Sequence, residues 1–121
     1  MKVTVQSQAL NDGLRRVLNI VNVRSTIPVL GNVLIVVRDG RLELSTTDLE
    51  VSITTSMEAQ VETEGETTLP AKKFGQIAGT LGSGEVRIET DESLTSTISC
   101  GNAMFHIMGL EPSEFPKELE F

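Results

Sequence analysis

The order of hydrophobic patterns repeats once along the chain, and this repeat constrains the fold more than any other feature of the sequence. An alternating segment is followed by one with apolar residues at helical spacing and then by three alternating segments, and the same order recurs. The helical segments are expected at residues 7–23 and 70–81, so their starts lie roughly 63 positions apart, although the two halves share little sequence identity. The sequence therefore predicts a pseudo-symmetric α+β domain of two strand–helix–three-strand units.

The expected strands alternate apolar and polar residues between turn signals. They cover residues 2–6, 33–37, 42–44 and 51–57 in the first unit, and 66–69, 85–90, 94–99 and 103–108 in the second. Asp39-Gly40 predicts a tight hairpin turn, Pro70 favours a helix start, and Gly82-Ser83-Gly84 is expected to end the second helix. The last stretch, with Pro112 and Pro116, is expected to be extended and peripheral.

Both helical segments are amphipathic, which places their polar sides in solvent. Their apolar stripes consist of Leu10, Leu14, Val17, Leu18 and Val21 in the first segment and of Phe74, Ile77, Ala78 and Leu81 in the second. Arg15 lies opposite the first stripe, Arg16 lies on its flank, and Lys72 lies on the polar side of the second segment. Two such units predict two helices on one face of the domain and antiparallel sheets on the outside.

The charges are distributed unevenly over these elements. The chain has a formal net charge of −7, yet the helical segments carry Arg15, Arg16, Lys72 and Lys73 against the single acid Asp12. The other 6 basic residues are outnumbered by 16 acidic ones. A basic helical face on an acidic protein can hold a polyanion loosely, which suits sliding better than tight binding. The same pattern is also typical of an ordinary solvated helix face, and the charges alone leave both interpretations open.

Length and composition fit one ordinary domain. The 121 residues can bury a core without disulfides or metal, and because Trp and Tyr are absent, that core must rest mainly on Val, Ile and Leu. No apolar run approaches the roughly 20 residues that cross a bilayer, and the amino-terminal residues lack the features of a signal peptide. The single Cys100 cannot form an internal disulfide. We therefore expect a cytoplasmic protein without membrane association.

No residues have the spacing of a catalytic or metal site. Alternation places His106 on the opposite strand face from Phe105 and Ile107, and Cys100 has no neighbour that would activate its thiol. The acidic run at residues 62–66 lacks the spacing of a calcium loop, and the glycines of residues 79–84 follow a helix instead of preceding one. We expect no cofactor and no metal, and for nucleic acid only sequence-independent contact with a duplex backbone.

Several motifs resemble one known family. The family is the bacterial DNA polymerase III beta subunit, the sliding clamps. Its early loop and strand are resembled by one continuous run of this chain, Arg24-Ser25-Thr26-Ile27-Pro28-Val29-Leu30-Gly31-Asn32-Val33-Leu34. Further matches follow in the same order: Thr47-Asp48-Leu49-Glu50, Leu69-Pro70-Ala71-Lys72-Lys73-Phe74, Gly109-Leu110 and Glu114-Phe115-Pro116. The resemblance covers essentially all 121 residues.

This resemblance implies a DNA-clamp fold in which two helices of each domain line a central hole and sheets form the rim. Family chains contain three such domains, and two chains close head to tail into a ring that encircles duplex DNA and tethers the replicative polymerase. Residues 1–121 resemble the first of the three domains, and the second and third are absent. The implied function is that of a replication processivity factor, an accessory subunit of the DNA polymerase III holoenzyme and not an enzyme.

The resemblance also implies roles for individual residues and partners. Arg24 matches a loop residue that touches DNA, and Arg15, Arg16 and Lys72 lie on the helices expected to face the hole. The positions at the joint with a second clamp chain are Lys73, Phe105 and Ile107. Asn102, Met104 and Gly79 depart from the family pattern, which implies fewer ion pairs and DNA contacts. The pocket that holds the polymerase and the clamp loader belongs to the absent domains.

The sequence leaves two alternatives to this function. The chain could be a small self-associating scaffold with a clamp-domain fold that does not encircle DNA, in agreement with its short length and net charge of −7. Salt discriminates between these interpretations, since backbone binding weakens steeply as salt rises and a scaffold shows no DNA affinity. An enzyme acting on DNA is disfavoured, because no metal-binding carboxylate set or activated nucleophile is visible.

Overall fold

The computed structural model describes residues 1–21 and 27–116 of the chain. In these residues the order of elements is the predicted double unit with one added strand. The first unit contains β1 (Lys2–Gln6), α1 (Ser7–Val17), β2 (Asn32–Arg38), β3 (Arg41–Thr47) and β4 (Ser52–Glu58). The second contains β6 (Gly65–Pro70), α2 (Ala71–Thr80), β7 (Glu85–Thr90), β8 (Thr95–Cys100) and β9 (Ala103–Met108), and β5 (Gln60–Thr63) connects the two.

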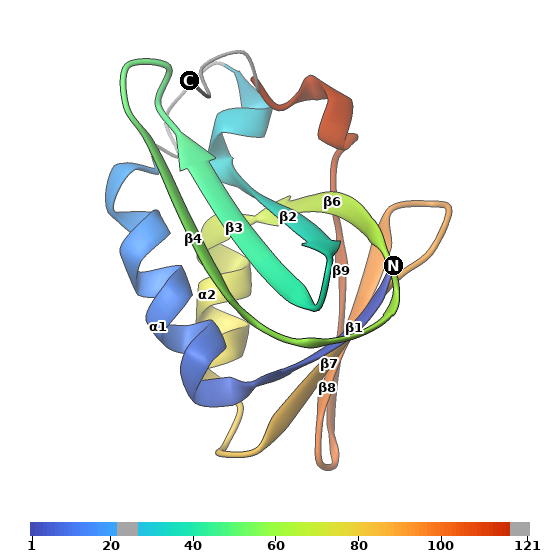
Figure 1. The fold of residues 1–121 in the computed structure, drawn as a ribbon. Coiled ribbons are helices and arrows are strands. Elements are labelled where there is room, and N and C mark those ends of the chain that lie inside the picture. Colours follow the sequence, from blue (N-terminus) through green and yellow to red (C-terminus); the bar gives the residue numbers. More distant parts are fainter. Residues whose placement is uncertain (22–26, 117–121) are drawn as a thin grey trace.

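The two units exchange their first strands. One sheet has the order β5-β1-β7-β8-β9 and the other the order β4-β3-β2-β6, with antiparallel pairing throughout. β1 thus pairs with β7 of the second unit, and β6 pairs with β2 of the first. Because each sheet needs a strand from the other half, the units cannot separate into two domains. Figure 1 shows both sheets beside the helix pair.

The helices pack antiparallel against each other and cover the main core. Leu10, Leu14 and Phe74 are at most 1% exposed, as the apolar stripes predicted. In the first half of α1, the Asn11 side chain donates a hydrogen bond to the Ala78 carbonyl in the last turn of α2. Past the end of α1, the Leu18 side chain lies where a side chain at Gly75 would have to sit. The carboxyl-terminal end of α1 therefore lies beside the first half of α2, and the two helices run antiparallel (Figure 1).

The first helix is shorter than the periodicity predicted. The α-helix ends at Val17 and continues as a short 3-10 turn (Leu18–Ile20), whereas the apolar spacing extended to residue 23. The Thr46 hydroxyl of β3 donates to the Val17 carbonyl, so the neighbouring sheet satisfies a backbone group that the next helical turn would otherwise use. None of the described helices is long and apolar enough to cross a membrane.

Two further features differ from the prediction: the hydrophobic pattern does not predict β5, and the prediction of a peripheral last stretch is wrong. β5 is four residues long and has Val61 as its one apolar residue, so alternation was too weak to reveal it. The stretch with Pro112 and Pro116 is not peripheral, because it contains a 3-10 turn (Pro112–Glu114) and buries Phe115 to 5% exposure. Phe115 forms a second small core with Val29 and Leu34 on the sheet face that points away from the main core.

A hydrogen-bond network ties this last stretch to the sheet. The Asn32 amide donates to the Thr68 hydroxyl at 3.1 Å, and this hydroxyl donates to the Leu110 carbonyl at 2.8 Å. The Leu110 amide donates to the Thr68 carbonyl at 3.3 Å. Gly109 precedes this bridge and approaches the Thr68 carbonyl so closely that a Cβ atom would overlap it. Backbone approach, and not a turn conformation, therefore requires glycine at this position.

The substitution Gly109→Ala tests this close approach. We expect it to lower the free energy of unfolding by about 3 kcal/mol, because backbone on both sides must shift to accept the methyl group. The matched control is Gly79→Ala in α2, where an added Cβ meets no atom within 4 Å. Since alanine is the better helix former, this control should gain up to about 1 kcal/mol. Urea unfolding followed by circular dichroism measures both, and equal stability of the two variants would contradict the packing described.

Candidate nucleic-acid interface

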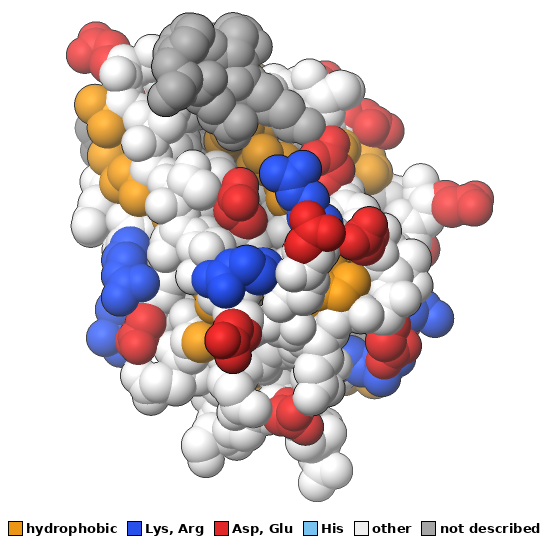
Figure 2. Space-filling view, viewed as in Figure 1, with side chains coloured by type: hydrophobic (Ala, Val, Ile, Leu, Met, Phe, Trp, Pro, Cys, Tyr) orange, Lys and Arg blue, Asp and Glu red, His pale blue; other side chains and the backbone are white. Residues whose placement is uncertain are grey.

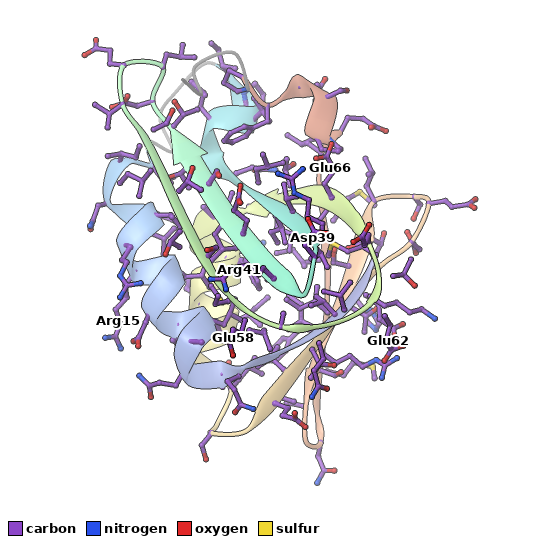
Figure 3. All side chains as sticks on the ribbon, viewed as in Figure 1. Arg15, Asp39, Arg41, Glu58, Glu62 and Glu66 are labelled. Atoms are coloured by element: carbon purple, nitrogen blue, oxygen red, sulfur yellow. The ribbon has the colours of Figure 1, made fainter. Side chains whose placement is uncertain are left out.

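Antiparallel packing gathers four basic residues at one end of the helix pair. Arg15 and Arg16 occupy the last turn of α1, and Lys72 and Lys73 occupy the first turn of α2. All four side chains are exposed. Figure 3 shows Arg15 projecting from α1 away from the sheets. We call these four residues the basic cluster. Helix periodicity predicted their exposure, but the antiparallel arrangement that brings them together is a property of the fold.

Three members of the basic cluster make no ion pair or hydrogen bond with any residue in the described part of the chain: Arg15, Lys72 and Lys73. Arg16 forms one long contact, from Nη1 to the Thr55 hydroxyl of β4 at 3.5 Å, which confirms its predicted place on the helix flank. The one acid on the two α-helices α1 and α2, Asp12, accepts a hydrogen bond from the Gln8 amide at 3.2 Å. The positive charge of the cluster is therefore not neutralised within the described residues.

The position of the lysines does not benefit the helix. The amino-terminal end of a helix carries partial positive charge, so a lysine in the first turn costs about 0.3–1 kcal/mol relative to an acid. α2 has Lys72 and Lys73 in this turn, with no acid and no side-chain cap. In contrast, the arginines lie at the negative end of α1, where a cation is stabilising. The lysines are therefore explained better by what they contact outside the domain than by helix stability.

Basic residues on the sheets lie among acids. Arg87 forms ion pairs with Glu89 at 2.7 Å and Glu62 at 3.4 Å, and the hydrogen bond from Arg87 holds the pKa of Glu89 below its usual value. Arg41 precedes Leu42, which is buried in the main core, so Arg41 lies on the opposite sheet face, and Figure 3 shows Asp39, Glu58 and Glu66 labelled on the same side. Figure 2 shows basic and acidic side chains interspersed over this face. Among the described residues, the helix side therefore carries an excess of positive charge that the sheet faces lack.

The remaining predicted site residues are placed differently. Arg24 lies in residues 22–26, outside the part of the chain that the structure describes. Phe105 is half-buried and Ile107 is 7% exposed, and both belong to β9, the last strand of its sheet. The structure therefore brings Arg15, Arg16, Lys72 and Lys73 to one end of the helix pair and places Phe105 and Ile107 on an edge strand.

Most of the motif residues pack in the core or form hydrogen bonds that hold a loop. Leu69, Ala71 and Phe74 are 0% exposed, whereas Lys72 and Lys73 between them are exposed. In the loop after β3, the Asp48 carboxylate accepts hydrogen bonds from the amides of Glu50 at 2.9 Å and Val51 at 2.8 Å. The bond from Val51, followed by that from Glu50, holds the pKa of Asp48 below its usual value. The exposed lysines stand out because the fold does not require them.

Residues considered for chemistry lie apart from one another. His106 is exposed, with Nδ1 3.1 Å from the Thr97 hydroxyl, and Cys100 is half-buried. Over residues 1–21 and 27–116, His, Cys, Asp and Glu form no group of three or more that could hold a metal ion. The helix face can attract a polyanion, and its described residues form no arrangement suited to catalysis.

Comparisons with known proteins agree with this picture. A family model described as DNA polymerase III beta subunit, N-terminal domain, matches residues 1–119. The beta sliding clamp of Synechococcus elongatus is 38% identical over 120 residues, which are 97% of this chain and 32% of that protein. The beta sliding clamp of Salmonella typhimurium is 36% identical and covers 96% of this chain and 32% of its own length. The chain thus spans about a third of the curated relatives that it matches.

Solved structures show the same extent of similarity. The DNA polymerase sliding clamp from Bacillus subtilis superposes with a TM-score of 0.93 at 30% identity, over 96% of this chain and 33% of that one. The sliding clamp from Caulobacter crescentus gives a TM-score of 0.92 at 32% identity, over 96% of this chain and 32% of that one. The clamp-domain fold expected from the sequence is therefore confirmed.

Charge reversal separates the helix dipole from general charge effects. Lys72→Glu and Arg15→Glu change the net charge equally, so any difference between them arises from the helix ends. We expect Lys72→Glu to raise the free energy of unfolding by about 0.5–1 kcal/mol and Arg15→Glu to lower it by a similar amount. Thermal and urea unfolding of this chain at low salt would measure both. A loss of stability in Lys72→Glu would show that Lys72 supports the fold.

Proposed function

The chain belongs to the DNA polymerase III beta subunit family, as a match to its amino-terminal domain, and from this premise we propose that it forms one segment of a sliding clamp. The clamp is a replication processivity factor that encircles duplex DNA and tethers the replicative polymerase. The basic cluster on the helix pair is the observation that supports this proposal most directly. In the proposed ring, Arg15, Arg16, Lys72 and Arg24 face the DNA.

The charges suit a contact that does not fix the DNA in one position. Exposed arginine and lysine side chains are long and flexible, and they attract phosphate oxygens without reading bases. Because the rest of the molecule carries a large excess of acid, DNA is repelled from the sheets and attracted only to the helices. With so few cations the attraction is weak, and the ring retains DNA by enclosure while the duplex slides.

The edges of the sheets support a ring made of joined domains. β4 and β9 are the last strands of the two units, and each lies at the end of its sheet with one side unpaired among the described residues. A domain with two such edges can be extended on both sides by strands of neighbouring domains. We propose that residues 1–121 are the first of three domains and that Lys73, Phe105 and Ile107 form the joint with a second clamp chain.

The remaining partners follow from the same proposal. The replicative polymerase and the clamp loader bind through the other two domains, since their peptide pocket lies outside this one. The relatives are named as clamps, which supports an accessory role without catalysis and without a cofactor. The proposed site of action is DNA in the bacterial cytoplasm.

A small self-associating scaffold is the second candidate function. It is favoured by the edges of β4 and β9, which no described strand pairs, and by exposed apolar residues on β9. Light scattering of the 121-residue chain over a concentration series separates the two candidates. A monomer supports a segment that needs further domains to close a ring, and a closed oligomer of this chain alone supports the scaffold.

Neutralisation of the helix face tests the proposed DNA contact. In the full-length protein, we expect Arg15→Gln with Lys72→Gln to weaken duplex binding and to lower the slope of log affinity against log salt by about 0.9 for each lost phosphate contact. Arg24→Ala should weaken DNA retention without unfolding the domain. Fluorescence anisotropy with a labelled duplex, repeated at several salt concentrations, measures these effects.

The matched control is Arg38→Gln with Arg41→Gln. These exposed arginines are at the end of the β2–β3 hairpin, on the sheet face opposite the helices, and their loss changes the net charge by the same amount. DNA binding of this control should equal that of the unmodified protein. Equal weakening in both double variants would show that net charge, and not the helix face, determines the affinity.

A further inference from the structure

Asp12, the one acid on α1 and α2, lies beside the arginines of the basic cluster. It is two positions from Leu10 and two from Leu14, which turns its side chain about 160° away from both of these buried residues. Arg15 and Arg16 come three and four positions later, so their Cβ atoms lie about 5–6 Å from that of Asp12. The Asp12 carboxylate therefore faces the same side of the domain as the two arginines.

Helix stability does not explain an acid at this position. Asp12 is the sixth residue of α1, beyond the first turn in which the helix dipole favours an acid. It forms no ion pair within the described residues, and Arg16, which has the spacing to pair with it, contacts the Thr55 hydroxyl instead. Asp12 accepts its hydrogen bond from the exposed Gln8 amide, and an uncharged asparagine could accept the same bond. The fold therefore does not need the negative charge itself.

We propose that Asp12 limits how tightly the helix face holds duplex DNA. This inference rests on the proposed function, because it concerns the same DNA contact. A phosphate bound by the arginines lies on the order of 10 Å from the Asp12 carboxylate, given the spacing of the Cβ atoms and the length of an arginine side chain. Two like charges at about 10 Å weaken binding by about twofold in bulk water, and by about fourfold where the dielectric constant is halved.

The exposure of these side chains fits a charge that weakens the contact without blocking it. Asp12 is half-buried, whereas Arg15 and Arg16 are exposed. Because aspartate is short and arginine is long, a phosphate meets the guanidinium groups first and the carboxylate only at a distance. The other exposed residues of α1 and of the 3-10 turn that follows it, Gln8 and Asn19, are uncharged. Asp12 is thus the single negative position on the exposed face of α1.

The experiment measures the duplex affinity of the full-length protein with Asp12→Asn. This substitution removes the charge and retains an oxygen that can accept the bond from Gln8. We expect duplex binding to tighten by about two- to fourfold at about 50 mM NaCl. The gain should fall below about 1.5-fold at about 500 mM NaCl, because salt screens charges at this distance. Fluorescence anisotropy with a labelled duplex measures the affinity, and urea unfolding measures the stability, which should be unchanged.

Three further variants make the result specific. Asp12→Glu keeps the charge and should retain the affinity of the unmodified protein. Asp12→Ala removes the charge and the Gln8 contact together, and it should tighten binding as much as Asp12→Asn while favouring the helix. Glu92→Gln changes the net charge by the same amount in the exposed turn between β7 and β8, away from the helix pair in Figure 1. This last variant should leave the affinity unchanged.

The possible outcomes separate this inference from the proposed function. If Arg15→Gln with Lys72→Gln weakens binding and neither neutral variant of Asp12 tightens it, the inference is overturned and the DNA contact remains. An equal gain in Glu92→Gln, or a gain that persists at high salt, would also overturn it. A loss of stability without a gain in affinity would show that Asp12 serves the fold alone. If no substitution on the helices changes binding at low salt, the proposed DNA contact is itself wrong, and this inference with it.

Discussion

The exchange of first strands between the two units is the constraint on which the rest of the domain depends. β1 completes the sheet of the second unit, and β6 completes the sheet of the first. Each helix begins directly where an exchanged strand ends, α1 after Gln6 and α2 after Pro70. The exchange thus fixes both helix starts and turns the helices antiparallel, and the four basic residues come together as a result.

Within each motif, some residues stabilise the fold and others are exposed and available for function. In the motif around α2, Leu69 and Phe74 fill the core, while Lys72 and Lys73 face solvent at the unfavourable end of the helix. Gly109 is required because the Thr68 carbonyl occupies the space of a side chain. A motif match therefore identifies the fold largely through buried residues, and the few exposed members are the ones that point to function.

Periodicity predicted what depends on one segment at a time. It predicted both helices, every strand except β5, and the exposure of Arg15 and Lys72. The predicted strand ranges agree closely with the observed ones, except that residues 42–44 cover only part of β3. It failed where distant parts of the chain decide the outcome. The Thr46 hydroxyl contributes to ending α1, Leu34 and Val29 bury Phe115, and pairing with β1 makes a strand of the weakly patterned residues 60–63. The candidate site divides in the same way, since side-chain exposure is local and the clustering of the four cations is not.

The antiparallel helix pair has a further electrostatic consequence. The negative end of α1 lies beside the positive end of α2, so each end acts on the side chains of its own terminal turn, but the two partial charges largely cancel at the distance of a bound polyanion. At that distance the potential is therefore set mainly by the side chains. Because the core does not depend on these side chains, their number and sign can change without rebuilding the domain. How strongly the surface attracts a polyanion and how stably the chain folds can thus evolve as nearly independent properties.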